Sequence, residues 1–141
     1  MNHSQYNNIS GIVNIYHSYY QIGTEFCKYY YQLWDNNFPL IGNLFDKNIK
    51  ITFLGNHFNN ITSLVNSNRN YGIWSFSHSN IYKQYQPIDD NTILISAFGT
   101  LCINNNNYYR KFSETIIIRR NIWGNWFITN LVFQLIPETL F

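Results

Sequence analysis

The sequence predicts an α+β fold in which three helices pack on one face of a strongly bent antiparallel sheet. Two observations predict it: apart from one alternating stretch, "NIKITFLGNHF", apolar residues recur every three or four positions up to about residue 70, and they recur at every second position from Tyr71 onward. Helical segments followed by a run of strands are typical of this class. The chain has 141 residues, of which 45% are apolar and 19% aromatic, so a single domain with a substantial core is expected.

The first element is expected to be a helix that ends near Trp34. Its apolar face repeats at spacings of three and four, over Ile15, Tyr19, Ile22, Phe26, Tyr30 and Leu33. The turn formers Asp35 to Asn37 end this helix, and Pro39 begins a second, short one. The stretch "NNITSLVNSNRN" predicts a third helix. Its asparagines and β-branched residues are poor helix formers, so this helix is expected to be a weak one.

The remaining elements are expected to be strands. The stretch "NIKITFLGNHF" predicts a tight hairpin, because apolar and polar residues alternate before the turn formers Gly55 and Asn56. A meander of four strands follows, with turns at "QPIDDN" and at the run Asn104 to Asn107, since asparagine tolerates positive φ. Gly99 lies in the middle of a predicted strand and indicates a bulge or bend in the sheet.

The last two predicted strands are apolar at both odd and even positions. An antiparallel sheet in a small monomer normally has one solvated face, so this pattern predicts that the outer face meets a partner. Pairing through the sheet is therefore expected, and the candidate residues are Ile117, Trp126, Ile128 and Val132. The alternative is that the extra apolar residues pack under a loop or under the N-terminal residues.

Charge and cysteine content argue against several classes of function. Only 11% of residues are charged and the formal net charge is +2, so we expect no binding of nucleic acid or of an anionic membrane. Cys27 and Cys102 lie far apart without metal-ligand spacing, so we expect no metal, cofactor or disulfide framework. The sequence lacks a bilayer-spanning stretch and a secretory signal, which favours a location in the cytoplasm or nucleus.

Two titratable residues are candidates for chemistry, but no catalytic residues are predicted. His78 lies in mid-strand, and a lone strand histidine without an acid partner is more often structural. Glu114, on the next strand but one, is the other candidate. Asp35 and the hairpin residue His57 are better explained as capping or solvated residues. A buried pair of His78 and Glu114, bonded to each other at the base of an open cavity, would favour an enzyme.

The sequence resembles the nuclear transport factor 2 family from about residue 19 to residue 136. The stretches that carry the resemblance are, in order, "IGTEFCKYYYQLWDNN", "ITFLGNHF", "YQPIDDNTILISAFGTL", "RKFSETIII" and "WFITNLVFQLI". The resemblance implies a cone-shaped domain over residues 19–141, with residues 1–18 as an N-terminal extension. It also implies pairing through the sheet, with a second copy or a related domain, and a hydrophobic cavity inside the cone.

The implied function is protein binding in transport between cytoplasm and nucleus, without catalysis. The resemblance places the partner-binding mouth of the cone at Phe53, Leu54, Phe133 and the run Asn104, Asn105, Asn106 and Asn107. Family members with acids in the hairpin and in this turn bind the lysines of Ran in its GDP form. Here Leu54 and asparagines replace those acids, so Ran binding of the usual type is expected to be weak or absent, because charge-assisted hydrogen bonds are about twice as strong as neutral ones.

Other partners and functions remain open. A similar branch of the family lacks those acids and pairs with a larger messenger-RNA export receptor. The resemblance further implies docking of phenylalanine-glycine nucleoporin repeats at the nuclear pore, with Tyr19 at the docking position, although core packing explains Tyr19 equally well.

The alternatives are an isomerase- or dehydratase-like enzyme or small-molecule binder that uses the cone cavity, and an adaptor domain of RNA-associated proteins. The end of the chain at Phe141 favours transport over the adaptor.

Overall fold

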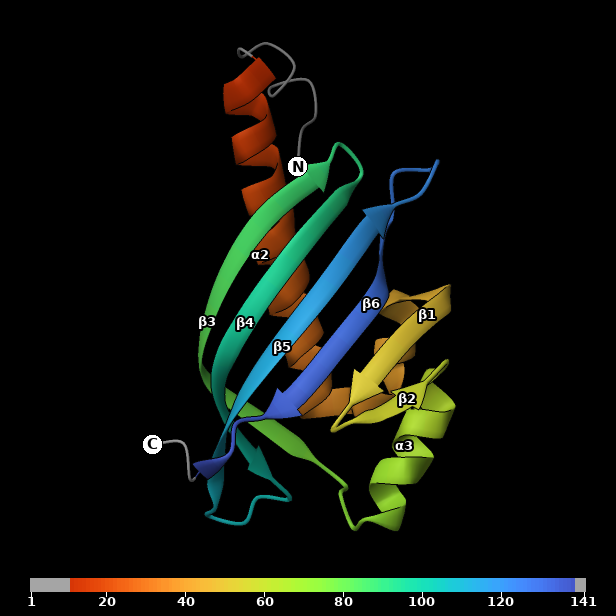
Figure 1. Cartoon of the computed structure of the whole chain (residues 1–141), viewed down its shortest axis with the longest axis vertical. Helices are drawn as coiled ribbons and strands as arrows, with labels where there is room; N and C mark the ends of the chain where they lie inside the picture. The colour runs from red at the N-terminus through yellow and green to blue at the C-terminus, as the bar shows by residue number, and fades with distance from the viewer. Residues whose placement is uncertain (1–10, 139–141) are drawn as a thin grey trace.

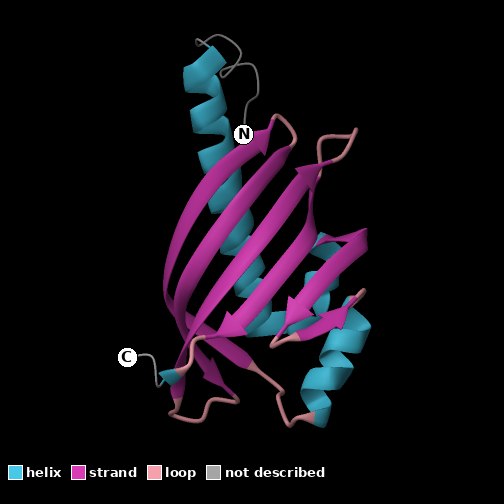
Figure 2. Cartoon of the chain, in the orientation of Figure 1, coloured by secondary structure: helices cyan, strands magenta, loops and turns pink. Residues whose placement is uncertain are grey.

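One long helix lies behind a curved six-stranded sheet in this computed structural model (Figure 1). The structure describes residues 11–138, with side chains from residue 18 onward. Figure 2 separates the two layers by colour: the sheet is in front, and the helix crosses its inner face diagonally. The α+β class predicted from the sequence is confirmed.

The order of the elements follows the prediction closely. They are helix α2 (Gly11–Asn37), 3-10 helix η1 (Phe38–Leu44), strands β1 (Phe45–Phe53) and β2 (Asn56–Phe58), helix α3 (Ile61–Asn70), and strands β3 (Phe76–Asp89), β4 (Thr92–Ile103), β5 (Tyr109–Arg120) and β6 (Trp126–Leu135). The segment that begins at Pro39 is a 3-10 helix, so the described chain has two α-helices rather than three. Of the predicted extension, residues 1–10 lie outside the described residues, and residues 11–18 begin α2.

The sheet is mixed rather than wholly antiparallel. Its strand order is β2-β1-β6-β5-β4-β3, and β1 pairs with β6 in parallel. Alternation of apolar residues predicts the two faces of a strand but not its neighbours, so the sequence could not reveal this pairing. As a result β6 is an inner strand with a neighbour on each edge.

A β-bulge opposite Gly99 bends the sheet. The register of β3 against β4 shifts between Ser79 and Tyr82, and Asn80 adopts a positive φ of 52°. A Cβ atom at Gly99 would lie 3.0 Å from the carbonyl oxygen of Asn80 and 3.1 Å from the Cα of Ile81. A side chain at this position would therefore push the two strands apart, and the predicted bend is confirmed.

The four-asparagine turn holds the loop that follows α3. Asn104 and Asn105 adopt positive φ values of 58° and 54°. The side-chain oxygen of Asn104 accepts hydrogen bonds from the backbone N–H groups of Trp74 at 2.7 Å and Ser75 at 3.2 Å. Its amide nitrogen donates to the carbonyl oxygen of Gly72 at 2.6 Å. Asn104 thus connects the β4–β5 turn to the start of β3.

Stacked aromatic rings pack in the core between the long helix and the sheet. Phe53 stacks on Phe133 at a centroid distance of 4.6 Å, and Phe133 stacks on Phe112 at 5.6 Å. The ring of Trp34 packs against both Phe53 and Phe133, and Trp34 is only 1% exposed. These four rings, which we call the aromatic stack, come from α2, β1, β5 and β6. They join the long helix to both halves of the sheet.

We predict that Trp34→Ala lowers the free energy of unfolding by about 3–5 kcal/mol, because the remaining rings cannot close over the cavity. Trp123→Ala is the matched control: Trp123 is 79% exposed, so a change within about 0.5 kcal/mol is expected. Urea denaturation followed by circular dichroism measures both values. Similar losses in the two variants would contradict the role of the aromatic stack.

Candidate functional site

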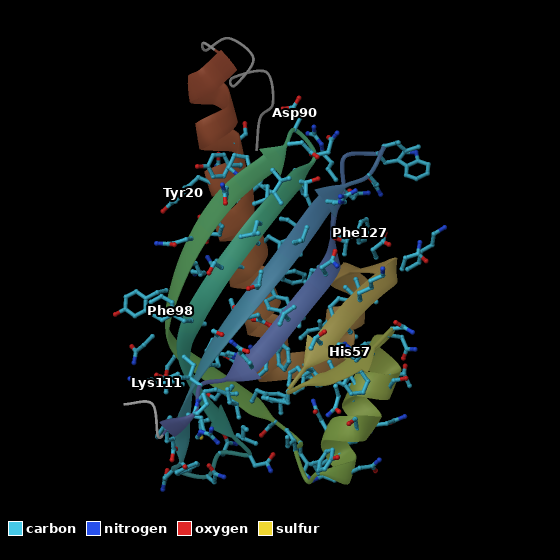
Figure 3. All side chains as sticks on the ribbon, viewed as in Figure 1. Tyr20, His57, Asp90, Phe98, Lys111 and Phe127 are labelled. Carbon is cyan, nitrogen blue, oxygen red and sulfur yellow. The ribbon has the colours of Figure 1, made fainter. Side chains whose placement is uncertain are left out.

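The outer face of the sheet carries exposed apolar side chains. Phe98 of β4 and Tyr82 of β3 stack at a centroid distance of 5.2 Å, and Phe98 is 52% exposed. Val132 of β6 is also exposed, and Ile117 of β5 is half-buried on the same face. Figure 3 views the molecule from the side of this face and labels Phe98. The face offers apolar area that a partner could cover.

Two of the four residues predicted for this outer face lie on the inner one. Ile128 is 0% exposed and belongs to the core, and Trp126 packs against the same core. The prediction was wrong for these two because β6 carries a bulge. Its register against β5 shifts between Ile117 and Ile118, which leaves Thr129 as an extra residue. A bulge reverses the alternation of faces, so residues before and after it no longer share a side.

The residues predicted for the mouth of the cone are only partly brought together. Phe53 and Leu54 line a pocket of about 410 Å³ between the β1–β2 hairpin and α3. Phe133 is buried in the aromatic stack, where it contacts Phe53. The side chain of Asn104 is bonded to the loop after α3, whereas Asn105, Asn106 and Asn107 are exposed on the turn.

Asn68 is a polar residue of the mouth pocket that the sequence analysis missed. It lies on α3 and is buried, and its side-chain amide nitrogen has no hydrogen-bond partner. An unpaired buried donor costs about 1–3 kcal/mol, so this amide is suited to donate to an oxygen of a bound group. The spacing of four residues from the buried Leu64 is the signal that could have revealed it, because such residues share a helix face.

Glu114 and two tyrosine hydroxyls form a buried polar cluster inside the cone. Tyr30 and Tyr31 each donate a hydrogen bond of 2.7 Å, one to each carboxylate oxygen of Glu114, which is 2% exposed. Burial raises the pKa of the Glu114 carboxyl above its ordinary value of 4.5, while the two hydroxyls and the nearby His78 oppose this rise. Burial likewise raises the pKa of both phenols.

His78 has an acid partner that the sequence analysis did not predict. Its Nδ1 lies 2.7 Å from Oδ1 of Asp35, and its backbone N–H donates to the same oxygen at 3.0 Å. Asp35 therefore joins the end of α2 to β3, beyond the capping or solvated role expected for it. His78 and Glu114 are bonded to different partners, and the tyrosines occupy both oxygens of Glu114. The arrangement resembles a structural network more than a base presented to a substrate.

The residue predicted to dock nucleoporin repeats, Tyr19, is half-buried and packs against the core. Its neighbour Tyr20 is exposed and contacts the ring of Tyr85 edge-on at 5.4 Å. Both Tyr20 and Tyr85 line a pocket of about 560 Å³ beside β3. A Cβ at Gly23 would lie 2.5 Å from the Tyr85 ring, so this glycine lets the ring lie against α2.

Neither a metal centre nor a membrane span is found in the part of the chain that the structure describes. No group of three or more histidine, cysteine, aspartate or glutamate side chains among these residues could hold a metal ion. Of the described helices, none is both long and apolar enough to cross a membrane. Cys27 and Cys102 are buried free thiols.

Comparisons with known proteins agree with the shape of the fold. The model of the nuclear transport factor 2 (NTF2) domain family matches residues 22–135. The chain is 25% identical to nuclear transport factor 2 of Candida albicans over 116 residues, which cover 81% of this chain and 92% of that protein. The structure of nuclear transport factor 2 from Cryptosporidium parvum is similar with a TM-score of 0.70 and 24% identity, covering 84% of this chain and 94% of that one.

Solved structures with other functions share the fold as well. The yeast UBP3-associated protein BRE5 has a TM-score of 0.66 at 19% identity, covering 83% of this chain and 95% of that one. A putative scytalone dehydratase from Novosphingobium aromaticivorans has a TM-score of 0.62 at 11% identity, covering 81% of each chain. These likenesses show the fold alone, which serves binding proteins and a putative enzyme.

We predict that the native chain loses stability as pH rises through the pKa of Glu114, and that Glu114→Gln removes this loss. The pKa is higher in the folded state, so the contribution of Glu114 is complete below its ordinary value of 4.5 and is lost as pH rises through the raised value. Glutamine keeps a neutral group at every pH. Urea denaturation of both chains, between about pH 4 and pH 8, measures the difference. A difference that does not change with pH would contradict the raised pKa.

Proposed function

Because the chain belongs to the nuclear transport factor 2 domain family, we propose that it acts by binding proteins, as a dimeric carrier between cytoplasm and nucleus. The observation that carries this proposal is the apolar outer face of the sheet, with Phe98, Tyr82 and Val132 exposed on it. A sheet face of this kind is stable in water when another protein covers it.

The proposed partner on this face is a second copy of the chain or a related domain. A two-fold pair would bring the same strands of both copies together, so that each Phe98–Tyr82 stack packs against the facing sheet. A related domain with the same fold presents similar strands. The outer face therefore supports pairing without distinguishing a homodimer from a heterodimer.

The mouth pocket is proposed to receive an apolar side chain of a cargo protein. Its rim carries Leu54 where an acid would attract lysines, and the buried amide of Asn68 is suited to a carbonyl or hydroxyl oxygen. A neutral pocket of this kind gives no charge-assisted pairing with a lysine. We therefore expect a cargo other than Ran in its GDP form, with a larger export receptor as the next candidate.

The pocket of Tyr20 and Tyr85 is the proposed docking place for phenylalanine-glycine nucleoporin repeats. It lies beside Tyr19, where the family resemblance places such docking, and it presents an exposed aromatic ring next to an open pocket of about 560 Å³. Each repeat would bind weakly through ring contacts, and several repeats together would allow the carrier to enter the pore and leave it.

A second candidate function is a dehydratase- or isomerase-like activity, or small-molecule binding, inside the cone. The buried Glu114 with its raised pKa, beside two tyrosine hydroxyls, favours it. One observation weighs against it: both oxygens of Glu114 are already bonded to tyrosine hydroxyls. Protein binding remains the better-supported function.

We predict that Phe98→Lys converts the native dimer into monomers, because the lysine would bury a charge without a partner in the paired face. Tyr29→Lys, on the exposed surface of α2, is the matched control and should leave the dimer intact. Sedimentation velocity at micromolar concentration distinguishes the two species. A native chain that sediments as a monomer would contradict pairing through this face with a second copy.

We predict that Tyr20→Ser weakens the binding of a phenylalanine-glycine repeat peptide by about two- to tenfold, the effect of losing one aromatic contact. Tyr29→Ser removes an exposed ring elsewhere on the same helix and should not change the affinity. Surface plasmon resonance on an immobilised repeat peptide gives both values. Equal weakening by the two substitutions would argue against docking at this pocket.

A further inference from the structure

The β5–β6 turn presents a rigid apolar tip to solvent. Ile122 is 88% exposed, and its neighbour Trp123 is also exposed. The side-chain oxygen of Asn121 accepts hydrogen bonds from the backbone N–H groups of Trp123 at 3.0 Å and Asn125 at 2.9 Å. Gly124 has a φ of 85° and donates its N–H to the carbonyl oxygen of Asn121 at 3.0 Å. The tip is therefore ordered before any partner binds, which lowers the entropic cost of binding.

Arg120 fixes this tip to the neighbouring β3–β4 turn. Its Nη2 and Nε donate to the side-chain oxygen of Asn91 at 2.9 and 3.1 Å, and Nη2 also donates to the carbonyl oxygen of Asp90 at 3.3 Å. Its guanidinium carbon lies over the ring of Trp126, 5.7 Å from the ring centroid. These accepting oxygens are uncharged, so Arg120 keeps its positive charge while its position is fixed.

A hollow of about 400 Å³ opens beside the tip, among β1, β5 and β6. The bulge at Thr129 and the break in the β1–β6 register between Phe45 and Lys50 separate the strands there. Bulges often lie next to functional sites because they redirect side chains. Phe127, labelled in Figure 3, is an apolar part of the lining. A second hollow of about 330 Å³ shares Arg120 with the first and reaches Ile122.

The larger hollow carries an excess of positive charge. Lys50, Arg119 and Arg120 line it, against the single carboxylate of Asp46. Among the residues that the structure describes, Lys50 and Arg119 form no ion pair. Asp46 accepts a hydrogen bond from the backbone N–H of Asn48 at 2.9 Å. The hollow therefore attracts an anionic group, and the exposed tip beside it attracts an apolar one.

We propose that the hollow and the tip together dock an acidic segment of a partner protein that also carries apolar side chains. Carboxylates of the segment would meet Lys50 and Arg119, and an apolar side chain would pack against Ile122 and Trp123. A protein segment fits better than nucleic acid, because the chain's net charge is only +2 and the exposed Ile122 and Trp123 offer a contact to an apolar side chain. The site is separate from the mouth pocket and from the Tyr20 pocket. It lies at the end of the sheet face that carries Val132, so a second copy paired on that face must leave this end uncovered.

A binding titration tests the proposal. The probe is a fluorescein-labelled peptide in which glutamate alternates with leucine and phenylalanine, and its partner probe carries glutamine in place of glutamate. We expect the native chain to bind the glutamate peptide about tenfold more tightly than the glutamine peptide in fluorescence anisotropy. Arg119→Glu should weaken binding of the glutamate peptide by about tenfold or more, and Lys50→Gln, on another strand, should weaken it in the same direction.

Matched controls distinguish binding at this site from non-specific electrostatic attraction and from non-specific hydrophobic binding elsewhere on the surface. Lys28→Glu changes charge on α2, and Tyr29→Ser removes an exposed ring there, so both should bind like the native chain. Trp123→Ser should weaken binding while the chain still sediments as the native chain does. Circular dichroism verifies that each variant is folded.

Three outcomes would overturn the proposal. The first is equal affinity of the native and Arg119→Glu chains for the glutamate peptide. The second is tighter binding of a fluorescein-labelled oligothymidylate than of the glutamate peptide, which would point to nucleic acid instead. The third is a change of oligomeric state in Trp123→Ser, which would place the tip in a subunit interface. The first two outcomes leave pairing through Phe98 unaffected, so failure of this proposal can be told apart from failure of the proposed function.

Discussion

The aromatic stack of Trp34, Phe53, Phe112 and Phe133 is the interaction on which the rest of the structure depends. Its rings come from the long helix α2, from β1, and from the last two strands, β5 and β6, which lie beside each other in the sheet. Without it, the parallel pairing of β1 with β6 would bring together segments far apart in sequence with little to hold them. Burial of these rings offsets the entropy of closing that long loop.

The surfaces proposed for binding surround this core: they are the outer sheet face, the mouth beside α3, and the ordered tip beyond β5. Glu114 is bonded to Tyr30 and Tyr31 in the core, and His78 is bonded to the exposed Asp35 at the end of α2, so both groups hold the helix to the sheet.

The sequence predicted most of the fold, and its errors have physical causes. Apolar residues spaced by three or four predicted the helices, and apolar residues spaced by two predicted the strands. Gly99 indicated the bend in the sheet. The outer-face assignment failed for Trp126 and Ile128, because one extra residue at Thr129 reverses the alternation and leaves no mark in the residue types. The pairs His78 with Asp35 and Glu114 with two tyrosines join residues distant in the chain, which no local pattern can reveal.

The central claim is that a second copy of the chain covers the outer face of the sheet. Methyl NMR of the native chain, in the presence of a soluble gadolinium chelate, tests it within one sample. Val132 is exposed in the single chain, as Ile122 is, so both methyl signals should broaden strongly if the chain stands alone. The account predicts that Val132 is shielded while Ile122 broadens fully. Equal broadening of the two would contradict it.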